Sequence, residues 1–254
     1  MGREALGLDM LPGLKKVGHI TPSSNTILEP VTSVMNRTLT EKVSHHFARI
    51  TVRQLTQRSS DSSQFEHAPM VSAASMLADC NPDAIVWNGT SGSWLGLDHD
   101  REICRQITAK TGIAASTSTL AFHAAFDAAG FTQIGLAVPY TADITDQIGK
   151  VYAEHGVSVV SEAHLSQSDN TKVGRNSYET LRQLLRDADS PEAQCIAVVC
   201  TNVAATPLVE EMEAELGKPI IDSIAVTFWE GCRMVGVDPK IDGWGAMMSG
   251  EIFS

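Results

Sequence analysis

The pattern that most constrains this chain is an apolar run that ends at small polar residues, and it occurs once in each half of the sequence. The run 84–87 is followed by Asn88–Ser91, and the run 197–199 is followed by Cys200–Asn202. Such runs are typical of buried parallel strands, and residues just past the carboxyl ends of these strands face the crevice where α/β proteins bind ligands. We therefore expect both polar segments to line one site.

Other landmarks recur in the same order. Pro22 and Pro139 each follow a predicted strand, and Gly112 and Gly217 each end a predicted helix. The separation is 117 residues for the prolines, 111 for the threonines after the two apolar runs, and 105 for the glycines. Small loop deletions between two related units would produce this slow decrease. Because strands that alternate with helices form parallel sheets, the sequence predicts two related α/β halves that face each other across one cleft.

The predicted elements fill most of the chain. Strands are predicted at 16–20, 43–52, 83–87, 113–115, 133–138, 157–163, 196–200 and 218–221. Helices are predicted up to about residue 36 and at 67–80, 98–112, 119–129, 143–155, 176–187, 207–216 and 224–235. The polar segment 56–64 is long enough to close over a site as a lid.

Composition excludes several classes of function. The 254 residues are 43% hydrophobic and 19% charged, as in an ordinary globular protein. The net charge of −11, without clustered basic residues, argues against nucleic acid as a partner. The first residues lack the apolar core of a signal peptide, and no apolar run reaches membrane-spanning length. The five cysteines and eight histidines show no metal-type spacing, so we expect reduced thiols, a cytoplasmic location and no metal site. The sequence is compatible with a homo-oligomer.

Cys200 is the main candidate for chemistry. A free cysteine is most often a small buried hydrophobe, and we expect Cys80, Cys104, Cys195 and Cys232 to be packing residues. Cys200, however, ends a strand at the point where the next helix is expected to begin. The free N–H groups and the positive dipole end of such a helix would lower the pKa of the thiol and attract a carboxylate.

The loop 89–93 is the second candidate. Glycines and hydroxyl groups directly after a buried strand can form an anion cradle, although they can also be a simple polar loop. The spacing matches neither a dinucleotide site nor a P-loop, so nucleotide binding is not expected. Ser23 and Asn25 occupy the equivalent loop after the first strand, and Tyr140 occupies it in the second half.

These motifs together resemble the maleate cis-trans isomerase and arylmalonate decarboxylase group of the aspartate/glutamate racemase superfamily. The resemblance rests on PSSNT at 22–26, GTSGSWLG at 89–96, VPY at 138–140, Asp169-Asn170 and Cys200-Thr201-Asn202, and it covers about 16–235. It implies two pseudo-twofold-related α/β domains, here 1–118 with 225–254 and 119–224, and a site in the cleft that uses no cofactor. By resemblance the substrate is a small dicarboxylate, whose carboxylates are bound by Asn25, Tyr140 and Asn170, and Thr90 and Ser91 help to form the oxyanion pocket. Ser23, Thr201 and Asn202 are further predicted binding residues because they lie in the same loops after the strands.

The sequence departs from part of this pattern at Gly89. Racemases and maleate isomerases of the superfamily carry a cysteine in each half, whereas arylmalonate decarboxylases have glycine at the first position and keep the second cysteine. Gly89 therefore resembles the decarboxylase branch, while the PSSNT and Asp169-Asn170 segments resemble the isomerase branch. We expect a malonate-type decarboxylase with Cys200 as its single proton donor. The alternatives are a maleate isomerase variant or racemase-like enzyme that lacks the first cysteine, and a dicarboxylate-binding protein without activity.

Overall fold

Two four-stranded parallel sheets form the centre of the molecule. The computed structural model describes residues 13–55 and 63–253, and within them the first sheet has the strand order β2-β1-β3-β4 and the second has β6-β5-β7-β8. Counted within each half, both sheets have the order 2-1-3-4. The predicted α/β fold is confirmed, and the repeat read from the sequence is a repeat of topology.

Burial explains why some strands were easier to recognise than others. The central strands β1, β3, β5 and β7 are almost entirely buried, so they read as unbroken apolar runs, whereas the edge strands β2 and β6 are mostly half-buried. The first sheet consists of β1 (Lys15–Pro22), β2 (Val43–Ile50), β3 (Ala84–Trp87) and β4 (Ala115–Thr117). The second consists of β5 (Gln133–Val138), β6 (Ser158–His164), β7 (Cys195–Val198) and β8 (Ile220–Asp222).

Helices connect the strands and cover the sheets. They are α1 (Leu28–Met35), α3 (His67–Ala78), α4 (Gly92–Leu95), α5 (Leu97–Thr111), α6 (Ser118–Ala129), α7 (Ala142–Glu154), α8 (Asn170–Val173), α9 (Tyr178–Asp187), α10 (Val209–Leu216), α11 (Ser223–Met234) and α12 (Gly245–Ser249). Short 3-10 turns lie at Asn36–Thr38, Ser63–Phe65, Thr206–Leu208 and Glu251–Phe253. As predicted, Gly112 and Gly217 end their helices in the left-handed region, with φ of 74° and 69°.

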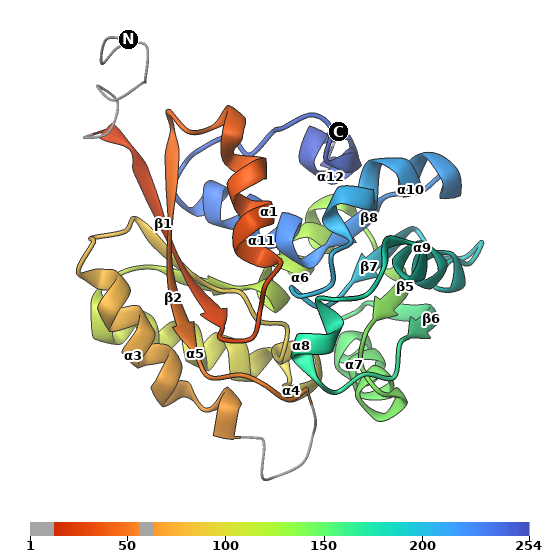
Figure 1. Ribbon diagram of the computed structural model, residues 1–254, viewed down its shortest axis with the longest axis horizontal. Coiled ribbons are helices and arrows are strands. Elements are labelled where there is room, and N and C mark those ends of the chain that lie inside the picture. The colour runs from red at the N-terminus through yellow and green to blue at the C-terminus, as the bar shows by residue number, and fades with distance from the viewer. Residues whose placement is uncertain (1–12, 56–62, 254) are drawn as a thin grey trace.

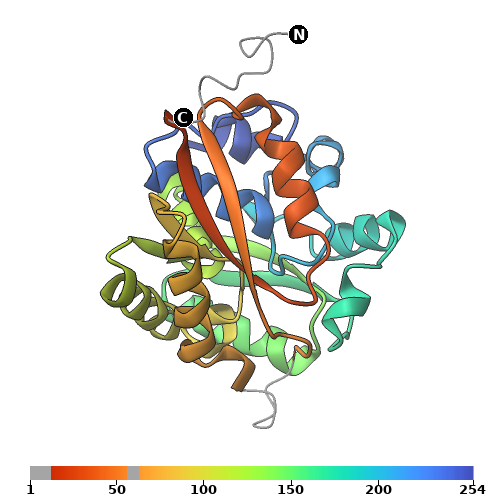
Figure 2. The same ribbon diagram turned by 60° about the vertical axis from the view of Figure 1, so that its left-hand side comes forward.

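The two halves lie side by side and share one hydrophobic cluster. Figure 1 shows the first half in red to yellow beside the second half in green to blue, and Figure 2 shows the long β1–β2 pair of the first sheet. The chain crosses back near its end, because α11 packs against α1, β3 and β4 of the first half and against α6, the helix that follows β4. The α4 helix of the first half packs against α7 of the second. The sheets are thereby held with the loops after β3 and β7 close together.

Several predicted boundaries change. The strand predicted at 113–115 lies at Ala115–Thr117, and the strand predicted at 196–200 ends at Val198. Three short helices, α4, α8 and α12, fall where loops or an irregular tail were expected. Residues 56–62 of the predicted lid lie outside the described part of the chain. Among the described helices, none combines the length and apolar character needed to span a bilayer.

Candidate active site

Cys200 lies in the loop after β7, two residues beyond the end of the strand. Its side chain is 4% exposed. Its amide N–H donates to Ser223 Oγ at 2.8 Å, and the Ser223 hydroxyl donates to the Val198 carbonyl at 2.6 Å. Ser223 therefore fixes the backbone of the loop from the first turn of α11.

The predicted cause of thiol activation was wrong. No helix begins at Cys200, because a series of turns separates it from the 3-10 turn at Thr206. Burial dominates instead and raises the pKa of Cys200 to about 11. Hydrogen bonds from the amides of Asn202 and Val203 and from the Tyr140 hydroxyl offset only part of this effect. The thiol is thus neutral at pH 7.

Gly89 lies after β3 and has no space for a side chain. A Cβ atom at this position would lie 2.1 Å from Cε2 and Cζ2 of the Trp87 indole and 2.5 Å from its Nε1. Residues two apart on an extended strand point the same way, which explains why this ring can cover Gly89. Trp87 is fully buried. The indole therefore takes up the space into which a first-half thiol would extend.

Three of the hydroxyl groups predicted to bind substrate, those of Thr90, Ser91 and Tyr140, line the same cavity. Thr90 Oγ1 and the Tyr140 hydroxyl share a hydrogen bond of 2.8 Å that joins the two halves. Burial holds the pKa of Tyr140 well above its ordinary value, so the phenol is protonated and can donate. Ser91 is 1% exposed, and its Oγ has no hydrogen-bond partner among the described residues.

The predicted asparagines link the two halves through side-chain hydrogen bonds. Asn25 Oδ1 accepts from the amides of Ile27 and Leu28, and its Nδ2 donates to the carbonyl and Oγ1 of Thr201. Thr201 in turn donates to the Asn88 carbonyl at 3.0 Å.

Asn202 and Asn170 form the second set of hydrogen bonds between the halves. Asn202 accepts from the Thr26 amide at 3.0 Å and donates to the Asn170 carbonyl at 2.6 Å. Asn170 Nδ2 donates to Ser24 Oγ at 2.8 Å. Ser23 Oγ pairs with the backbone of Val52. The polar atoms of Asn25 and Asn202 are thus engaged within the protein.

A small cavity brings seven of the ten predicted site residues together. Its volume is about 20 Å³, room for one water molecule. The predicted residues that line it are Gly89, Thr90, Ser91, Tyr140, Asn170, Cys200 and Thr201, whereas Ser23, Asn25 and Asn202 do not line it. Residues 53–55 pair with 168–170 through Leu55 N to Ser168 O at 2.7 Å and Asn170 N to Arg53 O at 3.1 Å.

The residues that form the apolar lining were not among the predicted site residues. The lining comprises Pro22, Val52, Leu55, Phe65, Trp87 and Trp94. Trp87 and Trp94 lie in or beside the motifs that carry the resemblance, but their residue type does not distinguish them from ordinary buried aromatic residues. Their position beside the polar loops was the one signal that could have identified them as residues of the site.

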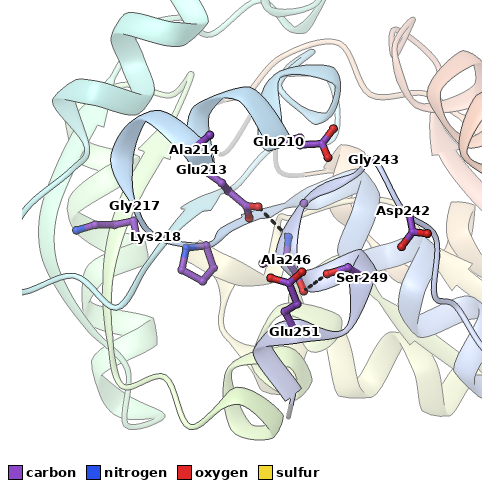
Figure 3. Close-up of a pocket in the computed structure, with 12 residues that line it drawn as sticks. Glu210, Glu213, Ala214, Gly217, Lys218, Asp242, Gly243, Ala246, Ser249 and Glu251 are labelled. Atoms are coloured by element: carbon purple, nitrogen blue, oxygen red, sulfur yellow. Dashed lines mark hydrogen bonds between the residues drawn. The ribbon is translucent and has the colours of Figure 1, made fainter.

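A larger cavity, of about 510 Å³, lies between α10 and the C-terminal segment. Its acidic lining includes Glu210, Glu213, Asp242 and Glu251 (Figure 3). The Glu213 carboxylate accepts from the amides of Ile220 and Ala246, so it holds α12 in place. The described ranges 13–55 and 63–253 contain no group of three or more His, Cys, Asp or Glu residues placed to hold a metal ion.

Comparison with known proteins relates this geometry to a family. Residues 32–248 match the family model described as arylmalonate decarboxylase. A maleate isomerase from Geobacillus stearothermophilus is 23% identical over 93% of this chain and 98% of its own length. The arylmalonate decarboxylase of Bordetella bronchiseptica is 24% identical over 51% of this chain and 55% of its own length.

Solved structures show the same fold. A maleate isomerase from Pseudomonas putida S16 with maleate superimposes with a TM-score of 0.86 at 19% identity, covering 95% of this chain and all of the other. A structure of arylmalonate decarboxylase gives a TM-score of 0.74 at 19% identity, covering 92% of this chain and 99% of the other. The resemblance stated from the motifs is confirmed: this chain belongs to the arylmalonate decarboxylase family, in the racemase-like group of lyases and isomerases that also contains the maleate isomerases.

Proposed function

We propose that this enzyme decarboxylates malonate-type dicarboxylates and that Cys200 protonates the resulting carbanion from one face. The observation that carries the proposal is the asymmetry of the cavity. The second half supplies a neutral thiol, whereas the first half supplies Gly89 covered by an indole. A mechanism that needs a thiol from each half has no place for the other sulfur atom.

The lining of the cavity suits the first step of this reaction. One carboxylate of the substrate lies against the apolar side chains of Val52, Leu55 and Phe65, where its charge is poorly stabilised, and this favours loss of CO2. The bond between the carboxyl carbon and the α-carbon breaks, and its electron pair passes into the enediolate of the second carboxylate. Hydroxyl groups of Thr90, Ser91 and Tyr140 donate to the enediolate oxygens where the charge develops.

Proton delivery completes the reaction. The Cys200 S–H transfers its proton to the α-carbon, and the resulting thiolate recovers a proton from water. A donor with a pKa of about 11 remains protonated at neutral pH, and the amides of Asn202 and Val203 stabilise the transient thiolate. Because the cavity holds about one water molecule, lining side chains must move to admit a substrate.

Maleate isomerisation is the second candidate, because maleate isomerases match this chain along nearly its whole length. A related enzyme from Nocardia farcinica was solved with a covalently bound succinylcysteine intermediate. Because this chain has Gly89 at the position of the first cysteine, Cys200 would have to supply the thiolate nucleophile. Burial of the thiol opposes that role, since only a small fraction is ionised at neutral pH.

One assay separates the two reactions. The purified protein is incubated with a panel of α-substituted malonates, and CO2 release is recorded, while loss of maleate is followed in parallel by ultraviolet absorbance. We expect CO2 from at least one malonate and no fumarate from maleate. Fumarate formation without CO2 release would replace the proposal with the isomerase alternative.

The pH profile provides an independent prediction. A proton donor must be protonated, so malonate turnover should stay level from pH 7 to pH 10 and decline only as the pH approaches about 11. A thiolate nucleophile would give the opposite slope, with a rate that rises roughly tenfold per pH unit below the pKa. Initial rates at saturating substrate, with circular dichroism at each pH as the folding control, decide between these profiles.

A further inference from the structure

The donors that line the active-site cavity are not all used within the protein. Three lining residues, Trp87, Ser91 and Trp94, carry a buried N–H or O–H group without a partner among the described residues. Each is at least nine-tenths buried. A buried donor without an acceptor destabilises the folded protein, so three of them around one cavity indicate that an acceptor binds there.

Trp87 is the most informative of the three. Its Nε1 lies close to Gly89, because a Cβ built on that residue would be 2.5 Å away. The indole nitrogen can donate but cannot accept, so the ligand atom that meets it must be an acceptor such as a carboxylate oxygen. Its backbone is fixed as well, since the Ser118 hydroxyl donates to the Trp87 carbonyl at 3.4 Å.

We propose that Trp87 is a substrate-binding residue whose indole N–H donates to a substrate carboxylate while its ring fills the space of the absent first-half thiol. In this role one side chain both supplies a donor from the first half and excludes a second proton donor from that side. The proposal deepens the proposed function by adding a residue to the same site. In this role Trp87 also determines substrate specificity, because it selects ligands that place an anionic oxygen beside the indole nitrogen.

The first test replaces Trp87 with phenylalanine, which keeps most of the ring and removes the N–H group. Binding of malonate is measured by isothermal titration calorimetry. A lost hydrogen bond to a charged acceptor predicts roughly tenfold to a hundredfold weaker binding. The melting temperature of the ligand-free protein should fall slightly, because phenylalanine leaves part of the space of the buried indole empty. A merely structural tryptophan would show the same loss of stability but would leave the malonate affinity of the folded protein intact.

A matched control is available at Trp229, which is 5% exposed and stacks on Phe253 away from the cavity. Trp229→Phe should leave malonate affinity unchanged.

The second test observes the N–H group itself. In the wild-type protein with ¹⁵N-labelled indoles, the resonance that disappears in Trp87→Phe should move downfield when malonate is added. Both readouts measure binding, so they remain decisive even if no malonate is turned over and the proposed function fails. Unchanged affinity in Trp87→Phe together with an unmoved indole resonance would overturn the role of Trp87, even in an active decarboxylase.

Discussion

Replacing Cys200 with alanine is expected to lower malonate turnover by about a thousandfold, within the range that general acid catalysis contributes. No other thiol lines the cavity in the described part of the chain, and burial raises the pKa of the Tyr140 hydroxyl well above its ordinary value, which makes the phenol a weak proton donor. The Ser91, Thr90 and Tyr140 hydroxyl groups stay in place in the variant. Malonate affinity should therefore stay within about threefold of the wild type, and CO2 release with initial-rate kinetics should show a loss confined to kcat.

Cys195 provides the control for this substitution. It lies on β7 in the same loop-and-strand unit, is fully buried and does not line the cavity. Cys195→Ala should reduce thermal stability slightly and leave kcat unchanged. If Cys200→Ala kept more than a tenth of the wild-type rate, the proton would have to reach the carbanion from another group, and the single-thiol mechanism would fail.

The features of the fold that sequence predicted well are those governed by burial. Strands such as β3 and β7 are covered on both faces, so their apolar runs stand out against the polar loops that follow. Because the buried strands of both halves appear as apolar runs, the repeated order of elements could be predicted from the sequence. Three short helices were missed, because four or five residues are too few to show a helical period and their stability comes from packing.

The site was predicted in position better than in chemistry. Strand ends place the loops around Gly89 and Cys200 together by topology alone, but the pKa of a thiol depends on how deeply the final packing buries it. The polar side chains show the same limit. The place of Asn25 after a strand predicts that it faces the site, yet two of its four side-chain hydrogen bonds are made to Thr201, which is 176 residues away.

The contact between Trp87 and Gly89 was hidden for a related reason. Sequence spacing shows that the two residues lie on the same side of an extended segment. It does not show whether the indole turns toward Gly89 or away from it, because that choice depends on packing from elements distant in sequence. The structure therefore changes the meaning of Gly89, from an absent thiol to a position whose side-chain space another residue occupies.

Introducing the thiol that related two-thiol enzymes use is accordingly expected to damage this protein. Gly89→Cys would place a Cβ atom 2.1 Å from the Trp87 ring, which is fully buried. Forced overpacking of this kind costs about 1–3 kcal/mol of unfolding free energy. We expect a lower midpoint in urea unfolding, and malonate turnover reduced at least tenfold because the displaced indole disturbs the loop that carries Thr90 and Ser91.

A double-mutant cycle tests whether the indole is the cause. In a Trp87→Leu background the ring is gone, so adding Gly89→Cys should cost less than in the wild type, with a coupling free energy of about 1–3 kcal/mol. Gly149 on α7 is the control position, since a Cβ atom there meets nothing within 4 Å, and Gly149→Cys should not destabilise the protein. The double variant also presents a thiol from each half. Its product from a prochiral malonate should therefore be closer to racemic than that of the Trp87→Leu variant, as measured by chiral chromatography. If the changes in unfolding free energy of the two substitutions were strictly additive, Trp87 would not exclude a first-half thiol. The asymmetry of the cavity would then need another explanation.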